Sequence, residues 1–325
     1  MPLASENHLA GKRPGHIIPS MANSMKLYIL GCYAATPRTD TQPTAQVLDC
    51  RNQLFLIDCA EGTQVHLRRN KIKFSRIDHI FISHLHGDHF FGLPGLLATF
   101  RLLGREKEIH IYGPKGIKDA ITIMLRLGDS TVGYPIRFHE LIKGDSERIF
   151  ENEKVTVDTI PLSHRVYTNG FLFREKPKEL GLNVDAVKKY GIDISHYHNI
   201  KKGKDVLLDD GSLIPNSELT FPPQKVKSYA FCSDTAYEPG IIPFVSDADV
   251  MYHDATFLEN EKHLAEKTGH STAIEAAKIA KEAQVGQLIL GHFSTRYTNT
   301  DQFLEEALTE FQNTSLARDG KVFEW

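Results

Sequence analysis

The segment between residues 77 and 97 contains four side chains that can bind metal ions within six residues. They are His84, His86, Asp88 and His89. The apolar run Ile80–Ile82 before them has the composition of a buried strand, and the apolar residues after them favour a helix. Four ligands this close cannot lie on one strand face, so we predict a tight turn in which Gly87 permits the bend. Imidazole and carboxylate groups suit Zn²⁺ or another borderline divalent cation.

The alternative for this turn is a polar surface loop that happens to carry histidines. A lone histidine would favour that interpretation, but the H-x-H-x-D-H spacing between a strand and a helix favours a metal site. Two ions would need more ligands than the turn offers, because zinc takes four or more. Three further candidates each follow a strand-like run, where a rigid sheet can hold them in place. They are His164, Asp234 and His292.

Each of these three residues also has a simpler interpretation. The chain has 16 histidines, so His164 could be an ordinary loop histidine and Asp234 an ordinary turn residue. If all seven residues act together, two ions roughly 3.5–4 Å apart would activate a water molecule for phosphoryl displacement. The same pair could hydrolyse a thioester or a lactam. The metal-binding residues therefore predict hydrolysis but leave the substrate open.

Composition narrows the class of protein. The 325 residues, 41% of them hydrophobic, suffice for one large domain or two ordinary ones. The four cysteines show neither CxxC spacing nor a disulfide pattern, which predicts a reducing, cytoplasmic compartment. No apolar run approaches the roughly 20 residues of a membrane span. The net charge of −3 means that a nucleic-acid partner would have to meet local basic patches.

Strand-like and helix-like segments alternate along the chain, which predicts an α/β layered fold. Pairs of short strands in the first half indicate mixed sheets. Residues 1–24 are polar and aperiodic, so we expect a disordered leader or a remnant of cloning before a domain at 25–325. A segment at about 174–227 interrupts the alternation, and we expect it to protrude as an insertion. Thr272 and Glu275 are placed to form a capping box before an alanine-rich helix.

Several motifs resemble those of known families. The histidine-rich turn resembles the signature of the metallo-β-lactamase superfamily. Over residues 25–325 the chain also resembles ribonuclease Z, a family of tRNA 3′-end processing endonucleases. The similar segments are DCAEGTQ at 58–64, GLPGLL at 92–97, HDAT at 253–256, HST at 270–272 and LILGHFSTRY at 288–297.

The resemblance implies an αββα sandwich, in which two mixed sheets lie between helix layers, and two Zn²⁺ ions per subunit. It implies that His84, His86 and His164 bind the first ion. Asp88, His89 and His292 would then bind the second ion, and Asp234 would bridge the two.

The resemblance also implies catalytic roles. Asp88 would accept a proton from the attacking water, and His270 would assist the leaving 3′-oxygen, with Asp254 orienting its ring. Simpler roles are open for Asp254 and for the segment of His270. Asp254 could pair with a neighbouring backbone group, and Ser271–Thr272 could serve only as a helix cap.

The implied activity is zinc-dependent cleavage of the 3′ trailer from precursor tRNA, leaving a 3′-hydroxyl. The insertion would be an exosite arm that grips the tRNA, and the subunits would pair as a homodimer. Basic residues could contact RNA phosphates or simply face solvent. They are Lys201, Lys202 and Lys204 in the arm, and Arg68, Arg69, Lys71 and Lys73 outside it.

Two other functions are compatible with the metal motif. One is a phosphodiesterase or arylsulfatase-like hydrolase of small substrates, which has no need of a basic protrusion of some 50 residues. The other is an RNA-binding or inactive partner subunit, which has no need of a complete set of metal ligands.

Overall fold

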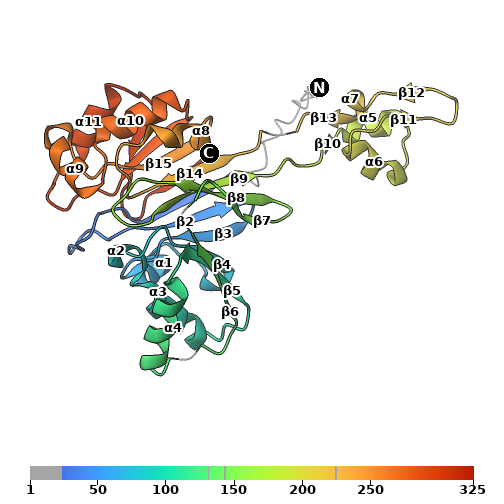
Figure 1. Ribbon diagram of the computed structural model, residues 1–325. Helices are drawn as coiled ribbons and strands as arrows, with labels where there is room; N and C mark the ends of the chain where they lie inside the picture. The colour runs from blue at the N-terminus through green and yellow to red at the C-terminus, as the bar shows by residue number, and fades with distance from the viewer. Residues whose placement is uncertain (1–23, 131, 143, 224) are drawn as a thin grey trace, which may run out of the picture.

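The computed structural model describes residues 24–130, 132–142, 144–223 and 225–325. The leader expected at 1–24 therefore lies outside the described residues except for Ser24. Within the described part, two seven-stranded sheets pack face to face, and helices cover both outer faces (Figure 1). The expected αββα sandwich and the mixed character of its sheets are confirmed.

The first sheet joins the C-terminal strand to the first half of the chain. Its strands run antiparallel from β18 to β3 and parallel from β3 to β6. In order they are β18 (Val322–Glu324), β1 (Lys26–Gly31), β2 (Ala45–Cys50), β3 (Gln53–Ile57), β4 (Ile77–Phe81), β5 (Ile109–Pro114) and β6 (Ile136–Leu141).

The second sheet repeats this mixture, with β17 to β14 parallel and β14 to β7 antiparallel. Its strands in order are β17 (Thr314–Leu316), β16 (Gln287–Gly291), β15 (Val250–Asp254), β14 (Ser228–Cys232), β9 (Asn169–Glu175), β8 (Val155–Pro161) and β7 (Arg148–Glu151).

Aromatic side chains fill the space between the sheets. The ring of Phe81 in β4 lies 5.4 Å from that of Phe171 and 5.3 Å from that of Phe173, both in β9. A separate apolar cluster joins the outer face of the first sheet to its helices. The helices of this half are α1 (Thr63–Arg69), α2 (Gly87–Phe90), α3 (Leu93–Leu102) and α4 (Ile117–Leu127).

The helices of the second half are α8 (Ile242–Val245), α9 (Lys262–Thr268), α10 (Ala273–Glu282) and α11 (Asp301–Leu308). The alanine face of α10 belongs to the main core and contacts β15 and β16. The helix begins with the expected capping box: Thr272 Oγ1 accepts from the backbone N of Glu275, and the Glu275 carboxylate accepts from the backbone N of Thr272. The capping box fixes the position of the chain just before α10, where His270 lies.

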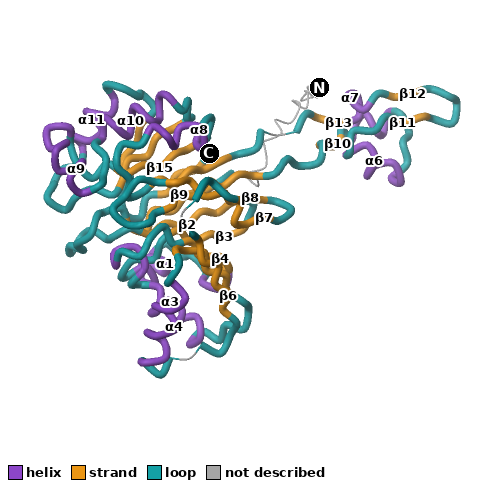
Figure 2. The backbone as a smooth tube through the Cα atoms, in the orientation of Figure 1, coloured by secondary structure: helices purple, strands orange, loops and turns teal. Residues whose placement is uncertain are grey.

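The insertion leaves the second sheet at the end of β9 and returns at the start of β14, and it extends far from the sandwich (Figures 1 and 2). Six apolar residues bury one another at its tip, apart from the main core. They are Val187, Ile192, Ile200, Val206, Ile214 and Leu219. The elements are β10 (Gly181–Leu182), α5 (Val184–Lys189), α6 (Tyr197–Lys201), β11 (Val206–Leu207), β12 (Leu213–Ile214), α7 (Asn216–Leu219) and β13 (Thr220–Phe221).

Short 3₁₀ turns complete the described elements, at Phe74–Arg76, Ile194–His196, Pro239–Ile241 and Glu259–Glu261. Within the insertion, β11 and β12 pair as an antiparallel hairpin. We refer to residues 176–227 as the arm.

Candidate metal centre

The seven residues expected to bind metal lie together at one edge of the sandwich. The loop after β4 supplies His84 and His86, and α2 supplies Asp88 and His89. The loops after β8, β14 and β16 supply His164, Asp234 and His292. Both sheets therefore contribute to one centre. Their side chains form two groups in which the potential ligand atoms lie within 4.8 Å of one another.

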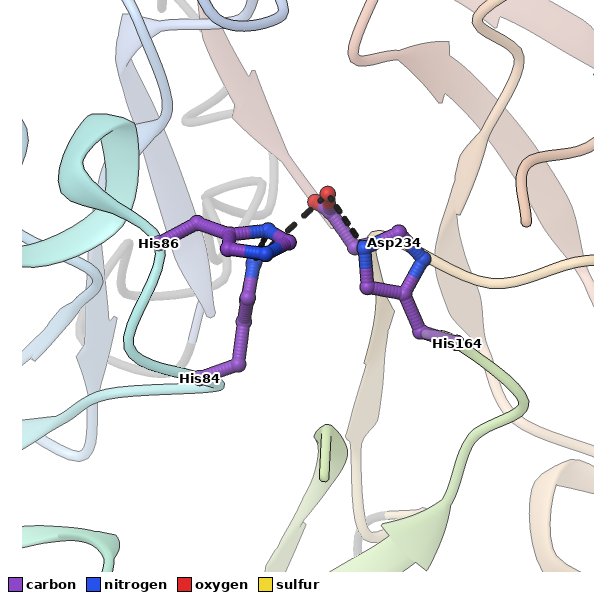
Figure 3. A group of neighbouring side chains, drawn as sticks. All are labelled: His84, His86, His164 and Asp234. Atoms are coloured by element: carbon purple, nitrogen blue, oxygen red, sulfur yellow. Dashed lines mark hydrogen bonds and ion pairs between the residues drawn. The ribbon is translucent and has the colours of Figure 1, made fainter. Parts of the chain in front are cut away.

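The first group contains His84, His86, His164 and Asp234. Figure 3 shows the three imidazole rings and the carboxylate turned toward one another. Asp234 Oδ1 lies 3.7 Å from Nε2 of His84 and 3.9 Å from Nε2 of His164. Nε2 of His84 also lies 2.9 Å from Nδ1 of His86.

The second group contains Asp88, His89 and His292. The other oxygen of Asp234 faces this group: Oδ2 lies 3.0 Å from Nε2 of His89 and 3.1 Å from Nε2 of His292. Asp88 Oδ2 lies 3.6 Å from the same nitrogen of His89. One carboxylate therefore presents one oxygen to each group, as a bridging ligand would.

The hydrogen bonding of the imidazole rings fits bound cations. Nε2 of His164 is buried and has no hydrogen-bond partner among the described residues, and Nε2 of His89 and His292 faces the carboxylate of Asp234. The opposite nitrogen of each ring is engaged: Nδ1 of His164 lies 2.7 Å from the Gly269 carbonyl, and Nδ1 of His292 lies 2.9 Å from Thr256 Oγ1. An imidazole held at Nδ1 offers a lone pair at Nε2, which is the usual arrangement of a metal-ligating histidine.

Asp58 was not expected among the site residues. Its Oδ2 lies 2.7 Å from Nδ1 of His89, and it accepts hydrogen bonds from the backbone N (2.8 Å) and the hydroxyl (2.9 Å) of Ser83. Ser83 Oγ lies in turn 3.0 Å from Nδ1 of His84. Asp58 and Ser83 are fully buried, so these contacts fix the rings of both histidines. The position of Asp58 at the start of the DCAEGTQ segment, directly after a strand, was the available signal.

Backbone conformation also shapes the centre. Asp58, Asp234 and His292 have φ values of 55°, 59° and 60°, in the left-handed region. Non-glycine residues seldom adopt this conformation, which costs of order 1–3 kcal/mol at each position. Asp58 directly follows β3, and His292 directly follows β16. Asp234 lies one residue further beyond the end of β14. The sharp turn at each strand end directs the side chain to the centre.

Gly87 has a different role from the expected one. Its φ does not lie in the left-handed region, so the turn does not require glycine for its backbone. A Cβ at this position would instead lie 2.4 Å from the ring of Phe91. Glycine is needed here because the aromatic ring packs directly on the backbone of α2.

The Asp234 carboxylate lies among several imidazole rings, and these rings set its charge. Burial raises the pKa of Asp234, but His292, His89 and His84 lower it more strongly, and the pKa lies well below its usual range. Asp234 is therefore an anion between the two groups. A carboxylate surrounded by imidazole nitrogens is a favourable set of ligands for a divalent cation.

His270 lies beside the centre, at the edge of the second group, and Asp254 holds its ring. Nδ1 of His270 is 2.7 Å from Asp254 Oδ2. Asp254 is fully buried and also accepts hydrogen bonds from the backbone and hydroxyl of Thr256, at 2.9 and 2.7 Å. Burial lowers the pKa of His270, but the adjacent Asp254 carboxylate outweighs this and the pKa is raised. Asp254 thus pairs with His270 in addition to backbone groups.

Asp88 lies at the solvent side of the second group, with 15% of its side chain exposed. Its Oδ2 accepts a hydrogen bond of 2.8 Å from the backbone N of Ala35. The three arm lysines, Lys201, Lys202 and Lys204, lie at the end of α6 and in the turn that follows it. The structure does not bring them to the centre of the same chain.

Comparisons with known proteins agree on the fold. The family described as Anti-Pycsar protein Apyc1 matches residues 25–185. The crystal structure of human tRNase Z, short form, superposes with a TM-score of 0.68 at 29% identity, covering 92% of this chain and 98% of that one. Fold and site thus define a metallo-β-lactamase-fold protein with grouped histidine and aspartate residues that could hold metal.

Sequence relatives give the particular family. Ribonuclease Z of Bacteroides fragilis is 46% identical over 294 residues, which cover 90% of this chain and 97% of that protein. Ribonuclease Z of Bacteroides thetaiotaomicron is 45% identical over the same length, covering 90% and 93%. The chain belongs to the ribonuclease Z family. No helix in the described part of the chain is long and apolar enough to cross a membrane.

Proposed function

We propose that this protein is the endoribonuclease that removes the 3′ trailer from precursor tRNA and leaves a 3′-hydroxyl on the tRNA. The observation that carries the proposal is its identity of 42–46% with relatives named Ribonuclease Z along about 90% of the chain. The seven metal-binding residues support it, because an inactive partner subunit would not need both groups.

We assign two zinc ions to the centre. His84, His86 and His164 would hold one ion, Asp88, His89 and His292 would hold the other, and Asp234 would contact both. When bound, such a pair lowers the pKa of water and stabilises the charge of an in-line phosphoryl displacement.

The residues of this chain supply the proton transfers. The Asp88 carboxylate borders solvent and accepts a proton from the attacking water. Asp254 accepts a hydrogen bond from the protonated Nδ1 of His270, so the charged ring carries a second proton on Nε2, which it donates to the departing 3′-oxygen. The raised pKa of His270 keeps the ring protonated nearer to neutral pH, as a general acid requires.

The arm supplies binding surface away from the chemistry. Its tip has an apolar cluster of its own and therefore presents Lys201, Lys202 and Lys204 from a folded unit and not from a loose loop. We assign these lysines to phosphate contacts with tRNA. Hydrolases of small substrates would gain nothing from such a protrusion.

We also propose a homodimer in the cytoplasm. Helices α3 and α4 pack together on the outer face of the first sheet, and four apolar side chains on them face solvent. They are Leu102 (84% exposed), Leu127 (79%), Ile123 (46%) and Met124 (39%). Large apolar side chains exposed on neighbouring helices indicate a protein contact, and sedimentation of the Leu102→Glu/Leu127→Glu double variant as a monomer would support this one. The four cysteines are buried and unpaired, as in a reducing compartment.

The decisive experiment uses purified protein, a 3′-extended precursor tRNA and bis(p-nitrophenyl) phosphate. We expect cleavage next to the discriminator nucleotide, loss of activity with a chelator and recovery with zinc. If the zinc-loaded protein hydrolyses only the small ester, the proposal is wrong and a small-substrate phosphodiesterase takes its place.

A further inference from the structure

A cavity of about 420 Å³ opens beside the metal centre and has no role in the steps above. It is bordered by the loop that carries His164 and by the turn before α8. Its lining includes Leu162, His164, Arg165, Val166, Tyr167 and Glu238. A volume of this size lies within the range of small-molecule sites.

Arg165 lies on the side of this cavity next to Gly269 and His270. It follows His164 directly, and it packs against the residue before His270: a Cβ on Gly269 would lie 3.5 Å from Cγ of Arg165 and 3.1 Å from Nδ1 of His164. Burial lowers the pKa of His86, and the charge of Arg165 adds to this effect. The same charge opposes the effect of Asp254 on His270. Arg165 therefore lies within electrostatic reach of both sides of the centre.

Arg165 has no counter-ion in the part of the chain that the structure describes. Its side chain forms no ion pair there, although Glu238 lines the same cavity. The Glu238 carboxylate accepts instead from the backbone N of Gly240, at 2.9 Å. An exposed guanidinium beside a hydrolytic centre, with its five donors uncommitted, is suited to bind a phosphate through two parallel hydrogen bonds.

We propose that Arg165 and this cavity form a nucleotide subsite of the substrate. Arg165 binds the phosphate that is cleaved or the one next to it, and the walls formed by Leu162, Val166 and Tyr167 take the base or sugar of the adjoining nucleotide. Tyr167 is fixed for this purpose, because its hydroxyl donates a hydrogen bond of 2.5 Å to the Ile142 carbonyl. The identification of the ligand as RNA rests on the proposed function, whereas the phosphodiester contact of Arg165 does not.

The test compares two substrates, precursor tRNA and bis(p-nitrophenyl) phosphate, on zinc-loaded protein. Arg165→Ala should lower kcat/KM for both substrates by about 10- to 100-fold, the size expected for one lost hydrogen bond to a charged group. Arg165→Lys keeps the charge without the fork and should recover part of the loss. Bound zinc should stay at the wild-type level. If Arg165 only held His164 in place, Arg165→Ala should lose zinc as well. Arg137→Ala, an exposed arginine at the start of β6, is the matched control and should behave as wild type.

A second variant addresses the cavity itself. Val166 is 40% exposed, so Val166→Trp can fill the cavity without disturbing the core. It should raise KM for precursor tRNA by about tenfold or more and affect the small ester much less, since the ester carries no nucleoside.

The outcomes separate the two proposals. If wild-type protein hydrolyses the ester but not the tRNA, the proposed function fails, and the Arg165 result on the ester still decides the phosphate contact. If wild type cleaves tRNA and Arg165→Ala does so with unchanged kcat/KM, the subsite is wrong. Equal losses for both substrates in Val166→Trp would show that the cavity does not hold a nucleoside.

Discussion

Oδ2 of Asp58 lies 2.7 Å from Nδ1 of His89, and both side chains are fully buried. This contact turns the other nitrogen of His89 toward Asp234, at 3.0 Å. The two residues are 31 positions apart in the sequence and follow adjacent parallel strands, β3 and β4. The sheet therefore sets the orientation of His89 through Asp58. Asp58 contacts Nδ1 of the ring and not Nε2, the candidate ligand atom.

Asp58→Asn tests this relationship. An asparagine of the same shape cannot accept from His89 as a carboxylate does, so the imidazole loses its fixed orientation and part of its basicity. We expect the affinity of the weaker zinc ion to fall by about 10- to 100-fold, measured by chelator competition. Asp78→Asn, at the opposite end of β4, removes an acid that pairs with Arg105 and should leave zinc affinity unchanged. Wild-type affinity in Asp58→Asn would contradict the orienting role.

The bridging position of Asp234 predicts a distinct pattern of metal loss. His164→Ala should weaken one ion and His292→Ala the other, whereas Asp234→Ala should weaken both, because its two oxygens face the two groups. Metal analysis after dialysis should give two equivalents in wild type, about one in each histidine variant and fewer than one in Asp234→Ala. At most one equivalent in reconstituted wild type would contradict a dinuclear centre.

The sequence predicted the parts of this site that have a local pattern. The H-x-H-x-D-H turn, the capping box at Thr272 and the strand ends before His164 and His292 all leave a signature in neighbouring residues. For this reason the fold class could be predicted before any coordinates, and so could the residues that the structure brings together as candidate ligands. That expectation depended on family resemblance for the pairing of ligands, because spacing alone does not tell which strands are adjacent.

What the sequence could not predict depends on contacts between distant segments. Asp58 and Thr256 hold ligand rings only because their strands lie beside those of His89 and His292 in the sheets. The role of Gly87 was wrongly predicted, since glycine suggests a special φ whereas the actual need is room for the ring of Phe91. The sequence did not point to Arg165, because a single arginine next to a histidine forms no recognisable motif.

His270 and Asp254 can be tested as a pair. If His270 donates a proton, His270→Ala should lower kcat for precursor tRNA by roughly 10²- to 10⁴-fold while bound zinc stays intact. Asp254→Asn should lower kcat in the same direction, and the double variant should be little worse than His270→Ala, because the two residues act as a unit. Loss of zinc in His270→Ala would instead make this residue a ligand or a folding element.

Asp319 predicts a pH dependence of stability that is separate from the metal centre. Burial raises its pKa to about 6, although hydrogen bonds from Cys32 and the backbone N of Gln42 oppose the rise. A carboxyl whose pKa is higher in the folded state binds its proton more tightly there. Its contribution is therefore fully present below about pH 4 and is lost as the pH rises through about 6.

Asp319→Asn removes this titration and keeps the shape of the side chain. Between pH 4 and 7, the unfolding free energy of wild type should fall relative to the variant by about 1–3 kcal/mol. Urea unfolding at several pH values measures the difference, and other titrating groups cancel because both proteins share them. A difference that does not change with pH would mean that Asp319 is ionised throughout.

The arm gives the test that best separates tRNA processing from hydrolysis of small esters. Glu175 and Lys227 join the two ends of the arm through a backbone hydrogen bond of 2.8 Å. A short Gly/Ser bridge can therefore replace residues 178–225 without moving β9 or β14. This deletion also removes the separate apolar cluster at the tip and should leave the main core and every candidate ligand in place.

We expect the deletion to raise KM for precursor tRNA strongly and to preserve zinc content and hydrolysis of bis(p-nitrophenyl) phosphate. Neutralising Lys201, Lys202 and Lys204 together should have a milder effect with a characteristic salt dependence. Each lost phosphate contact lowers the slope of log affinity against log salt by about 0.7–0.9, so the slope should flatten by up to about two to three. Neutralising three exposed lysines outside the arm, Lys115, Lys118 and Lys281, is the matched control for net charge. An unchanged KM in the deletion variant would mean that the arm does not bind tRNA, and a small-substrate hydrolase would then fit this chain better.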